Sequence, residues 1–306
     1  ANLKLQAGQT VVITGAGSGF GLELARLAAA KGLNLVLTDV QQDALDAAVA
    51  ELSAVGVQVA ALRGDVSRAE DVQALADLCM ERFGAPHVVI NNAGVAHGGL
   101  IWEHTQRDWE WVLGVNLFGV VHGLRVFMPL MLEAARQDPT WQGHMVNVAS
   151  MAGLLNSPNM GAYNVSKHAV VSLSETLYQD LALVTDQVHA SVLCPYFVPT
   201  GIHLSHRNRP AELRSEGKPT ASQMIAQAMS TKAVTSGRVT AADTAQLVFN
   251  AIEAGQFYVY THPQALGMVQ TRLEDVVQAR NPTDPFAGKP ELGEQLRKAL
   301  REAMKD

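Results

Sequence analysis

The sequence predicts an α/β protein in which helices cover both faces of a doubly wound parallel sheet. Apolar runs of strand length alternate along the chain with longer segments whose apolar residues recur with helical period. The strand-length runs are apolar at almost every position, as strands are when both faces of their sheet are covered. Right-handed crossovers between such strands place ligands at the carboxyl ends of the strands.

The expected elements begin with residues 10–14 (TVVIT), a β-branched run that leads through a glycine-rich turn into a helix at residues 19–31. Further strands are expected at residues 33–38, 57–62, 87–91, 144–149, 188–193 and 256–260. Helices between them are expected at residues 41–54, 68–83, 105–135, 161–185, 221–231 and 241–254. Strands that alternate with helices in this way predict βαβ units in one sheet.

The organisation of the chain predicts a single domain over residues 1–262 with two additions. An insertion at residues 195–237 is rich in proline, glycine and basic residues, so it is expected to be irregular around one helix. Residues 263–306 are expected to be a helical extension packed on the domain. Its two amphipathic segments are residues 266–280 and 291–305.

Composition excludes several classes of protein. A chain of 306 residues that is 48% apolar can bury a core without disulfides or metal. Its 29 acidic and 23 basic residues give a net charge of −6, which argues against nucleic acid or an anionic membrane as partner. Cys79 and Cys194 are too few for a disulfide framework or a zinc site. With no apolar run near membrane-spanning length and no leader pattern, a cytoplasmic protein is expected.

A glycine-rich turn, residues 14–21 (TGAGSGFG), directly follows the first strand and opens the first helix. Glycines there allow positive φ and let a pyrophosphate approach the backbone closely. The helix N-terminus offers unpaired N–H groups and a partial positive charge to the phosphates. The turn therefore predicts a dinucleotide site, and the alternative is a tight turn without a ligand.

Asp39 stands directly after the second strand, 24 residues beyond Gly15. A carboxylate at this place can accept hydrogen bonds from both hydroxyls of the adenosine ribose, and it would repel the 2′-phosphate of NADP. No basic residue at positions 16, 17, 40 or 41 offsets that repulsion. NAD is therefore favoured over NADP, and the alternative role for Asp39 is to cap the helix at residues 41–54.

Tyr163 and Lys167 are four residues apart and share one face of the expected helix. A free phenol has a pKa of ~10, too high for a base at neutral pH, and lowering it to about 7 would require about 4 kcal/mol. A neighbouring ammonium and a positive nicotinamide would both favour the phenolate. A surface or packing role is the alternative for the pair taken alone.

Three further features point to the same edge of the sheet. Ser150 ends the strand at residues 144–149, and its hydroxyl could hydrogen-bond a substrate oxygen and hold it beside the phenol. Asn116 lies in the middle of an expected helix, where asparagine is a poor helix former. Residues 91–94 (NNAG) follow the fourth strand, so their turn also faces the ligand edge.

In these motifs the sequence resembles the short-chain dehydrogenase/reductases, of the branch with the glycine motif T-G-x-x-x-G-x-G. That motif is at residues 14–21, N-N-A-G is at residues 91–94 and Y-x-x-x-K is at residues 163–167. The resemblance covers about residues 5–262 and implies a Rossmann-like fold and an NAD-dependent alcohol dehydrogenase. The glycine spacing differs from the G-x-x-G-x-x-G of nucleotide-sugar epimerases, which disfavours that alternative.

The resemblance also implies roles for four catalytic residues. Tyr163 would take the alcohol proton during oxidation or give it back during reduction, and Ser150 would orient and polarise the substrate oxygen. Lys167 would bind the nicotinamide ribose and lower the pKa of the tyrosine. Asn116, holding a water through its helix kink, would connect Lys167 to solvent as a proton relay.

The cofactor-binding residues that the resemblance implies come from every turn at the ligand edge. Asp65 matches the acid that contacts the adenine, and Thr200 matches the threonine that contacts the nicotinamide carboxamide. The full set is Gly15, Gly17, Ser18, Gly19, Phe20, Gly21, Asp39, Asp65, Val66, Asn92, Ala93, Gly94, Tyr163, Lys167, Pro195, Val198 and Thr200.

The sequence departs from the family at one place, where the usual Pro-Gly after the sixth strand is Pro195-Tyr196. An aromatic side chain there puts the shape of the substrate site in doubt. The substrate residues expected are His97, Met151, Leu155 and Tyr196, with the insertion as a substrate loop. Because few charges occur among the candidates before Arg207, the expected substrate is a bulky, uncharged, apolar or aromatic secondary alcohol or its ketone.

The same residues allow two alternative functions. An NADP-dependent carbonyl reductase is the first alternative, and a nucleotide-binding sensor without chemistry is the second, although a sensor has no need of the four catalytic residues together. No metal is expected, since His203 and His206 lack nearby carboxylates. Family members associate through the helices that correspond to residues 105–135 and 161–185, so a homodimer or homotetramer is expected.

Overall fold

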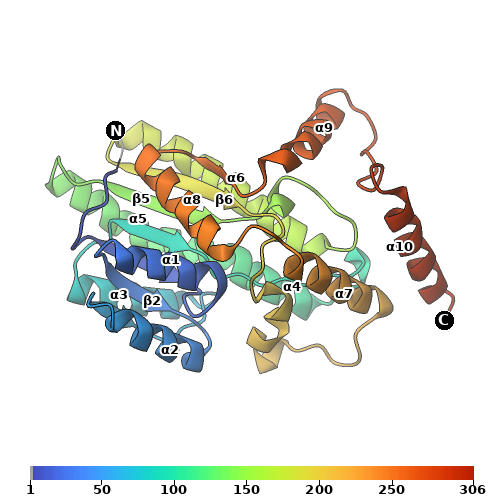
Figure 1. The fold of residues 1–306 in the computed structure, drawn as a ribbon, viewed down its shortest axis with the longest axis horizontal. Coiled ribbons are helices and arrows are strands. Elements are labelled where there is room, and N and C mark those ends of the chain that lie inside the picture. The colour runs from blue at the N-terminus through green and yellow to red at the C-terminus, as the bar shows by residue number, and fades with distance from the viewer. Residues whose placement is uncertain (1–2) are drawn as a thin grey trace.

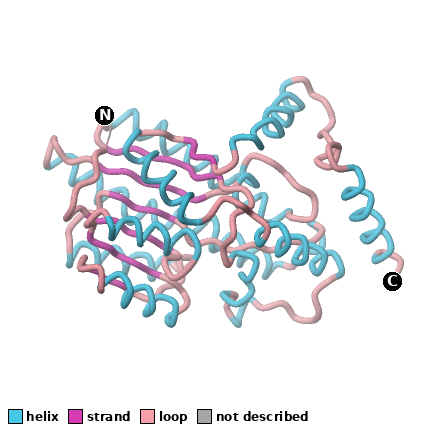
Figure 2. The backbone as a smooth tube through the Cα atoms, viewed as in Figure 1, coloured by secondary structure: helices cyan, strands magenta, loops and turns pink. Residues whose placement is uncertain are grey.

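Seven parallel strands form one sheet in the order β3-β2-β1-β4-β5-β6-β7. The structure is a computed structural model, and it describes residues 3–306. Figure 1 shows the strands side by side with helices in front and behind, and Figure 2 separates the strands from the helices by colour. The strands are β1 Thr10–Thr14, β2 Asn34–Thr38, β3 Val59–Ala61, β4 Val88–Asn91, β5 Gly143–Val148, β6 Val188–Cys194 and β7 Tyr258–Tyr260. The predicted doubly wound α/β fold is confirmed.

Helices connect successive strands, as parallel pairing requires. They are α1 Gly19–Ala30, α2 Gln42–Ser53, α3 Ala69–Arg82, α4 Gln106–Leu113, α5 Gly119–Gln137, α6 Gly161–Val184, α7 Ala221–Thr235, α8 Ala241–Ala254, α9 Leu266–Val277 and α10 Pro290–Ala303. Most observed ends lie within two residues of the predicted ones, but α7 runs four residues further than predicted, and α9 ends three residues earlier.

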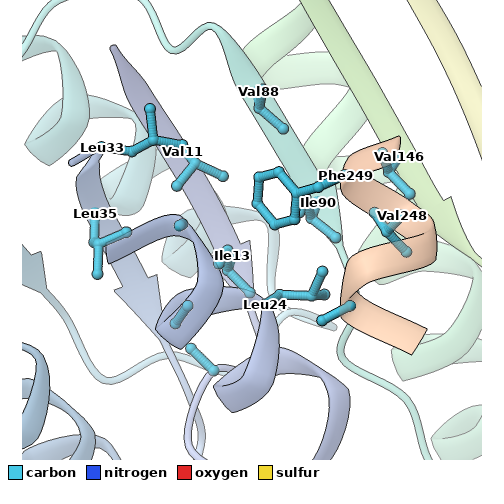
Figure 3. Packing of buried hydrophobic residues seen from close by; sticks show 14 of the residues in the cluster. Val11, Ile13, Leu24, Leu33, Leu35, Val88, Ile90, Val146, Val248 and Phe249 are labelled. Atoms are coloured by element: carbon cyan, nitrogen blue, oxygen red, sulfur yellow. The ribbon is translucent and has the colours of Figure 1, made fainter. Parts of the chain in front are cut away.

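The core lies on both faces of the sheet, because successive strand residues point to opposite sides. Ile13 of β1 packs with Leu24 of α1 and Phe249 of α8 on one face (Figure 3). Its neighbour Val12 packs on the other face with Phe127 of α5. Each strand residue therefore meets a helix, which is why the strands are apolar throughout rather than alternating.

The long helix predicted at residues 105–135 is interrupted. Thr105 begins α4 with a capping box in which its hydroxyl accepts from the Asp108 N–H and the Asp108 carboxylate accepts from the Thr105 N–H. A π-helical segment, Gly114–Phe118, then separates α4 from α5. Such segments shift the register of a helix by one residue, and they concentrate at functional sites.

Taken together, Gln106–Gln137 is long and apolar enough to cross a membrane by length and composition. The expectation that no segment would reach that length was therefore wrong. The apolar side chains of this segment include Phe127 and Met131, which are fully buried against the sheet. The apolar composition of this segment is explained by its position, because helices that cover a parallel sheet bury apolar side chains against it.

Between β6 and α7 the chain forms short 3-10 turns at Ile202–Asn208 and Ala211–Leu213, within the segment predicted to be irregular. Beyond β7, the tail forms α9 and α10, as predicted. In Figure 1 they stand off from the sheet at the end of the chain. Val269 of α9 is buried against the α6 side of the molecule, and Leu296 is the buried residue of α10, which contacts α7.

Candidate functional site

A cavity of about 460 Å³ lies at the point where the sheet changes direction. β1 stands between β2 and β4, so the chain proceeds from β1 toward one edge of the sheet and later returns to build the other edge from β4. Such a switch point leaves room between the turns at the carboxyl ends of the strands. The turns after β1, β2, β4 and β6 line the cavity, together with α6 and the loop before α7.

The glycine turn has the backbone that the sequence predicts. Gly15 and Gly19 have φ of +64° and +55°, a conformation that side-chain-bearing residues rarely adopt. A Cβ on Gly21 would lie 2.0 Å from the Gly15 carbonyl oxygen, so no other residue fits there. Ser18 precedes α1, and its side chain caps none of the N–H groups of that helix. The turn thus presents backbone to the cavity, as a diphosphate requires.

Asp39 lines the cavity at the end of β2 and is held by two backbone groups. Its Oδ2 accepts from the Gly17 N–H at 2.8 Å, and its Oδ1 accepts from the Gln41 N–H at 2.9 Å. Each carboxylate oxygen keeps lone-pair capacity for a further donor such as a ribose hydroxyl. Asp39 was alternatively expected to cap the helix that follows. It does so only indirectly, because the N-cap residue of α2 is Gln41 and Asp39 accepts the Gln41 N–H.

Two basic residues that the sequence analysis did not consider lie close to this end of the cavity. Arg63 donates from Nε to the Val40 carbonyl at 3.1 Å, and Arg207 lines the cavity from the loop before α7. A search of positions 16, 17, 40 and 41 misses them because Arg63 follows β3 and Arg207 comes from a distant loop. The predicted preference for NAD over NADP therefore depends on Asp39 alone, and not on an absence of basic residues near the ribose.

A single hydroxyl joins the turns after β1 and β4. Thr14 Oγ1 accepts from the N–H groups of Asn92 and Ala93 at 2.9 and 3.0 Å. The Asn92 side chain donates back to the Thr14 carbonyl at 3.0 Å. The predicted N-N-A-G motif thus fixes the floor of the cavity against the glycine turn.

Lys167 and Tyr163 both line the cavity from α6, as their spacing predicts. The Lys167 ammonium is 5.7 Å from the centre of the Tyr163 ring, and it donates to the Val148 carbonyl at 3.3 Å. Burial lowers the pKa of Lys167 to about 8. Burial also raises the pKa of Tyr163, against a smaller lowering by a hydrogen bond with the Ser150 hydroxyl.

In the protein without cofactor, burial therefore acts against the predicted lowering of the phenol pKa. The loss of hydration on burial disfavours the charged phenolate. Of the two cations named in the prediction, only the ammonium belongs to the chain.

Ser150 is placed beside Tyr163 by the end of β5. The residue has an extended backbone, and its Oγ accepts from the Ala152 N–H at 3.0 Å while donating weakly to the Pro195 carbonyl at 3.4 Å. These contacts hold the hydroxyl at the carboxyl edge of the sheet, where a substrate oxygen can replace the long bond to Pro195.

Asn116 lies in the π-helical segment and is 1% exposed. Its Oδ1 accepts from the Val95 N–H, and its Nδ2 donates to the Val95 carbonyl, both at 2.8 Å. The same Nδ2 donates to Ser166 Oγ at 3.0 Å, and Ser166 donates in turn to the Tyr163 carbonyl. The predicted helix irregularity is present, but the side-chain amide is occupied by these groups, so any water held there must use the backbone.

Most of the predicted cofactor-binding residues line the cavity. These are Gly15, Ser18, Gly19, Phe20, Asp39, Asp65, Val66, Asn92, Ala93, Gly94, Tyr163, Lys167, Pro195, Val198 and Thr200. Gly17 and Gly21 stand behind them, where they let the turn pack against Asp39 and against its own backbone. Asp65 is oriented by its neighbour, because its Oδ1 accepts from the Ser67 N–H at 3.0 Å and from the Ser67 hydroxyl at 2.6 Å.

Of the four predicted substrate residues, Tyr196 lines the cavity and three do not. Met151 is 0% exposed, and Leu155 packs against the same core cluster. The residues after Ser150 form a short turn, Met151–Gly153, that directs them into the core rather than toward the cavity. The apolar wall comes instead from Met160, which precedes α6, and Phe197, which contacts Tyr196 with ring centres 4.2 Å apart and ring planes tilted by 40°.

His97, the fourth, belongs to a cluster outside the cavity. The ligand-type atoms of His97, His104 and Asp108 lie within 4.8 Å of one another, an arrangement that could hold a metal. Arg209 already pairs with the Asp108 carboxylate at 2.7 Å, and a guanidinium at that distance repels a metal cation. The cluster is better explained as an ion pair with two imidazoles packed beside it.

Comparison with known proteins agrees with this geometry. The family model described as short chain dehydrogenase matches residues 9–210. The chain belongs to the short-chain dehydrogenase family. A solved short-chain dehydrogenase/reductase from Burkholderia phymatum in complex with NAD has 50% sequence identity and a TM-score of 0.90, and the match covers 92% of this chain and 99% of that one.

Curated relatives of this short-chain dehydrogenase match over most of their length. The 1-deoxy-11-beta-hydroxypentalenate dehydrogenase of Streptomyces avermitilis is 34% identical over 268 residues, which are 87% of each chain. The CLA biosynthesis dehydrogenase/reductase of Lactiplantibacillus plantarum is 32% identical over 274 residues, or 88% of this chain and 93% of the relative. The short-chain dehydrogenase is thus an oxidoreductase that uses a nicotinamide cofactor.

Proposed function

We propose that this short-chain dehydrogenase oxidises a bulky, uncharged secondary alcohol to its ketone with NAD, or catalyses the reverse reaction. The observation that carries the proposal is the meeting of Tyr163, Ser150 and Lys167 at one end of a cavity whose other end holds Asp39. A dinucleotide fits such a cavity, because the glycine turn leaves no room for side chains where the diphosphate would lie.

Three side chains would each take one part in the transfer of hydride and proton. The nicotinamide, when bound, supplies the hydride acceptor for the alcohol carbon. Ser150 donates a hydrogen bond to the substrate oxygen and holds it beside Tyr163. The Tyr163 oxygen takes the hydroxyl proton as the carbonyl forms, or returns it during reduction. Lys167, with its ammonium beside the ring, favours the phenolate form that accepts this proton.

Asp39 supports NAD rather than NADP. Its two oxygens face the cavity end where the adenosine ribose would lie, and a 2′-phosphate there would meet a carboxylate. Arg63, which lies beside Val40 at the same end, favours a second candidate, an NADP-dependent carbonyl reductase, because a guanidinium attracts a phosphate.

The lining beside Tyr163 supports an apolar substrate. Met160, Tyr196, Phe197 and Val234 present apolar surface there. Two aromatic rings in contact offer a broad apolar wall that suits an aromatic or polycyclic substrate better than a short aliphatic one. A relative named for a hydroxypentalenate substrate fits the expectation of bulk, but that substrate is a carboxylate and does not support the absence of charge.

The decisive experiment is a substrate screen that follows nicotinamide absorbance with NAD and with NADP. The screen pairs 1-phenylethanol with 2-butanol for bulk and with mandelate for charge. We expect the highest kcat/KM for 1-phenylethanol with NAD. A preference for mandelate would contradict the uncharged substrate, a preference for NADP would favour the second candidate, and cofactor binding without any turnover would favour a sensor.

Three expectations stay predictions alongside this function. A homo-oligomer follows from family membership, and light scattering tests it. The other two are a cytoplasmic location and the absence of a nucleic-acid or membrane partner.

A further inference from the structure

The loop between β6 and α7 covers the cavity at its open side. We refer to residues 201–216 of it as the cap loop, and Figure 1 shows this segment in gold near α4 and α7. Ile202, Ser205, Arg207, Asn208 and Pro210 of the cap loop line the cavity. The loop therefore forms one wall of the site in which the dinucleotide would lie.

Arg207 is the feature of the cap loop that the function proposed above does not use. Among the described residues, Arg207 and Lys167 are the two basic residues that line the cavity, beside the carboxylates of Asp39, Asp43 and Asp65. The Arg207 side chain is exposed, and none of the ion pairs found among residues 3–306 involves it. A guanidinium that faces a cavity without an acidic partner is suited to an anionic ligand.

The position of Arg207 is fixed at two points. At the ribose end, Gln41 Nε2 donates to the Arg207 carbonyl at 3.2 Å and to Asn208 Oδ1 at 2.7 Å. At the other end, the guanidinium lies against Gly201, where an added Cβ would be 2.7 Å from Arg207 Nη2. The side chain thus reaches from the ribose end toward the residue that follows Thr200.

Thr200 lies against the glycine turn itself. A Cβ on Gly19, the first residue of α1, would be 3.3 Å from the Thr200 Cβ. The guanidinium therefore stands near the N-terminus of α1, on the cap-loop side of the cavity. The diphosphate of a dinucleotide must cross this stretch, between the ribose beside Asp39 and the nicotinamide beside Tyr163.

We propose that Arg207 binds the diphosphate of the dinucleotide from the cap loop, opposite the backbone of the glycine turn. The inference rests on the proposed function, since it requires a dinucleotide in this cavity. A guanidinium matches two adjacent phosphate oxygens better than an ammonium does, because its N–H groups form a planar fork. Charge from the side chain would then add to the partial charge at the N-terminus of α1.

A buried ion pair holds the cap loop in the position that this contact needs. Arg209 Nη2 is 2.7 Å from Asp108 Oδ1, and the two side chains are 9% and 0% exposed. The Arg209 guanidinium also lies 4.9 Å from the centre of the Trp111 ring. Asp108 is fixed by the capping box of α4, so the pair ties the cap loop to a rigid helix two residues from Arg207. Arg209 is in this sense a positioning residue.

The test compares binding of ADP-ribose with binding of adenosine, which lacks the diphosphate, by calorimetry and by competition. We expect Arg207→Gln to weaken ADP-ribose binding roughly tenfold, the usual scale for a charged hydrogen bond, and to leave adenosine binding unchanged. Arg207→Lys should recover part of the loss. Arg214→Gln is the matched control, because this exposed arginine of the cap loop does not line the cavity.

A second pair of variants tests the positioning role. Arg209→Gln should weaken ADP-ribose binding in the same direction and speed tryptic cleavage within the cap loop. The double variant with Arg207→Gln should bind ADP-ribose no more weakly than Arg207→Gln alone, because the two residues act through one contact. Arg136→Gln, which breaks an exposed ion pair with Glu133 on α5 away from the cap loop, should change neither measurement.

The outcomes separate this inference from the function on which it rests. If the unaltered protein binds ADP-ribose and Arg207→Gln binds it equally well, the inference is wrong while the dinucleotide site stands. If Arg207→Gln weakens only ligands with a 2′-phosphate, Arg207 serves the ribose and not the diphosphate. If the unaltered protein binds neither ADP-ribose nor NAD, the proposed function itself fails.

Discussion

The ammonium of Lys167 lies 5.7 Å from the centre of the Tyr163 ring and bonds to the Val148 carbonyl. Both side chains line one cavity, and the hydrogen bond of the ammonium is to the backbone. In the protein without cofactor, burial keeps the phenol in its protonated form and favours loss of the lysine proton. A positively charged nicotinamide bound beside the phenol would favour its ionised form, so we expect the acid–base chemistry of the site to depend on cofactor binding.

Tyr163→Phe removes the proton acceptor and little else. We expect kcat to fall by a factor on the order of 10² to 10⁴, the range for loss of a general acid or base. The affinity for NAD should stay within twofold, because no described hydrogen bond of the glycine turn or of Asp39 involves the phenol. Steady-state kinetics and calorimetry measure the two effects. Tyr178→Phe, at an exposed tyrosine elsewhere on α6, is the control and should change neither.

Lys167→Met should change how stability depends on pH. Burial lowers the pKa of Lys167 from 10.5 to about 8. Between these values the unfolded chain binds a proton that the folded chain has lost, so the unaltered protein gains stability as the pH rises through this window. The gain is on the order of 3 kcal/mol at most. Methionine does not titrate, so the variant lacks this gain.

Denaturant unfolding of both proteins from pH 7 to pH 10.5 isolates the effect of Lys167. Other groups titrate in the same range, and they cancel in the difference between the two proteins. We expect Lys167→Met to be the more stable protein at pH 7 and its advantage to shrink as the pH rises. An advantage that stays constant across the window would show that the buried ammonium is not the source.

Asp39→Ala tests the choice of cofactor. The Asp39 carboxylate accepts two backbone N–H groups and faces the ribose end of the cavity. Its loss should raise KM for NAD roughly tenfold, as expected for a charged hydrogen bond, and should improve turnover with NADP. Asp46→Ala removes an exposed carboxylate from α2, the helix that follows Asp39, and should leave the kinetics with both cofactors unaffected. Unchanged selectivity in Asp39→Ala would contradict the role given to this residue.

Gly21→Ala and Gly267→Ala form a matched pair at helical glycines. A Cβ on Gly21 would lie 2.0 Å from the Gly15 carbonyl oxygen, and relief requires a shift of the glycine turn. We expect a loss of about 3 kcal/mol in stability together with loss of NAD binding. No heavy atom lies within 4 Å of a Cβ on Gly267, so alanine there should be neutral or stabilise the protein by up to about 1 kcal/mol. Thermal unfolding measures both changes.

The sequence predicted best what depends on short-range pattern. Strand–turn–helix order placed the glycine turn and Asp39 at one edge, because parallel strands all end on the same side. A four-residue spacing placed Tyr163 and Lys167 on one face of α6, because helical geometry is local. Both kinds of inference need no knowledge of how distant segments meet.

The errors arose where distant segments decide the outcome. Met151 was expected in the cavity, but the turn after β5 packs it into the core under α6. Nothing near Arg209 in the sequence indicates a partner 101 residues away, yet its pairing with Asp108 shapes the cap loop. The pKa of Tyr163 was assigned from its neighbour, and burial, which depends on the whole fold, reversed the direction.

The Thr14 hydroxyl holds together the two turns that line the switch point of the sheet. The turns after β1 and β4 lead to helices on opposite faces of the sheet, α1 on one and α5 on the other, so the chain separates beyond the ends of these paired strands. Thr14 joins the two turns at this point, because its hydroxyl accepts hydrogen bonds from two backbone N–H groups of the turn after β4. Valine has the same shape as threonine but no hydroxyl, so it would fill the space and leave both N–H groups unpaired. The link between the two turns therefore depends on one oxygen atom rather than on the size of the side chain.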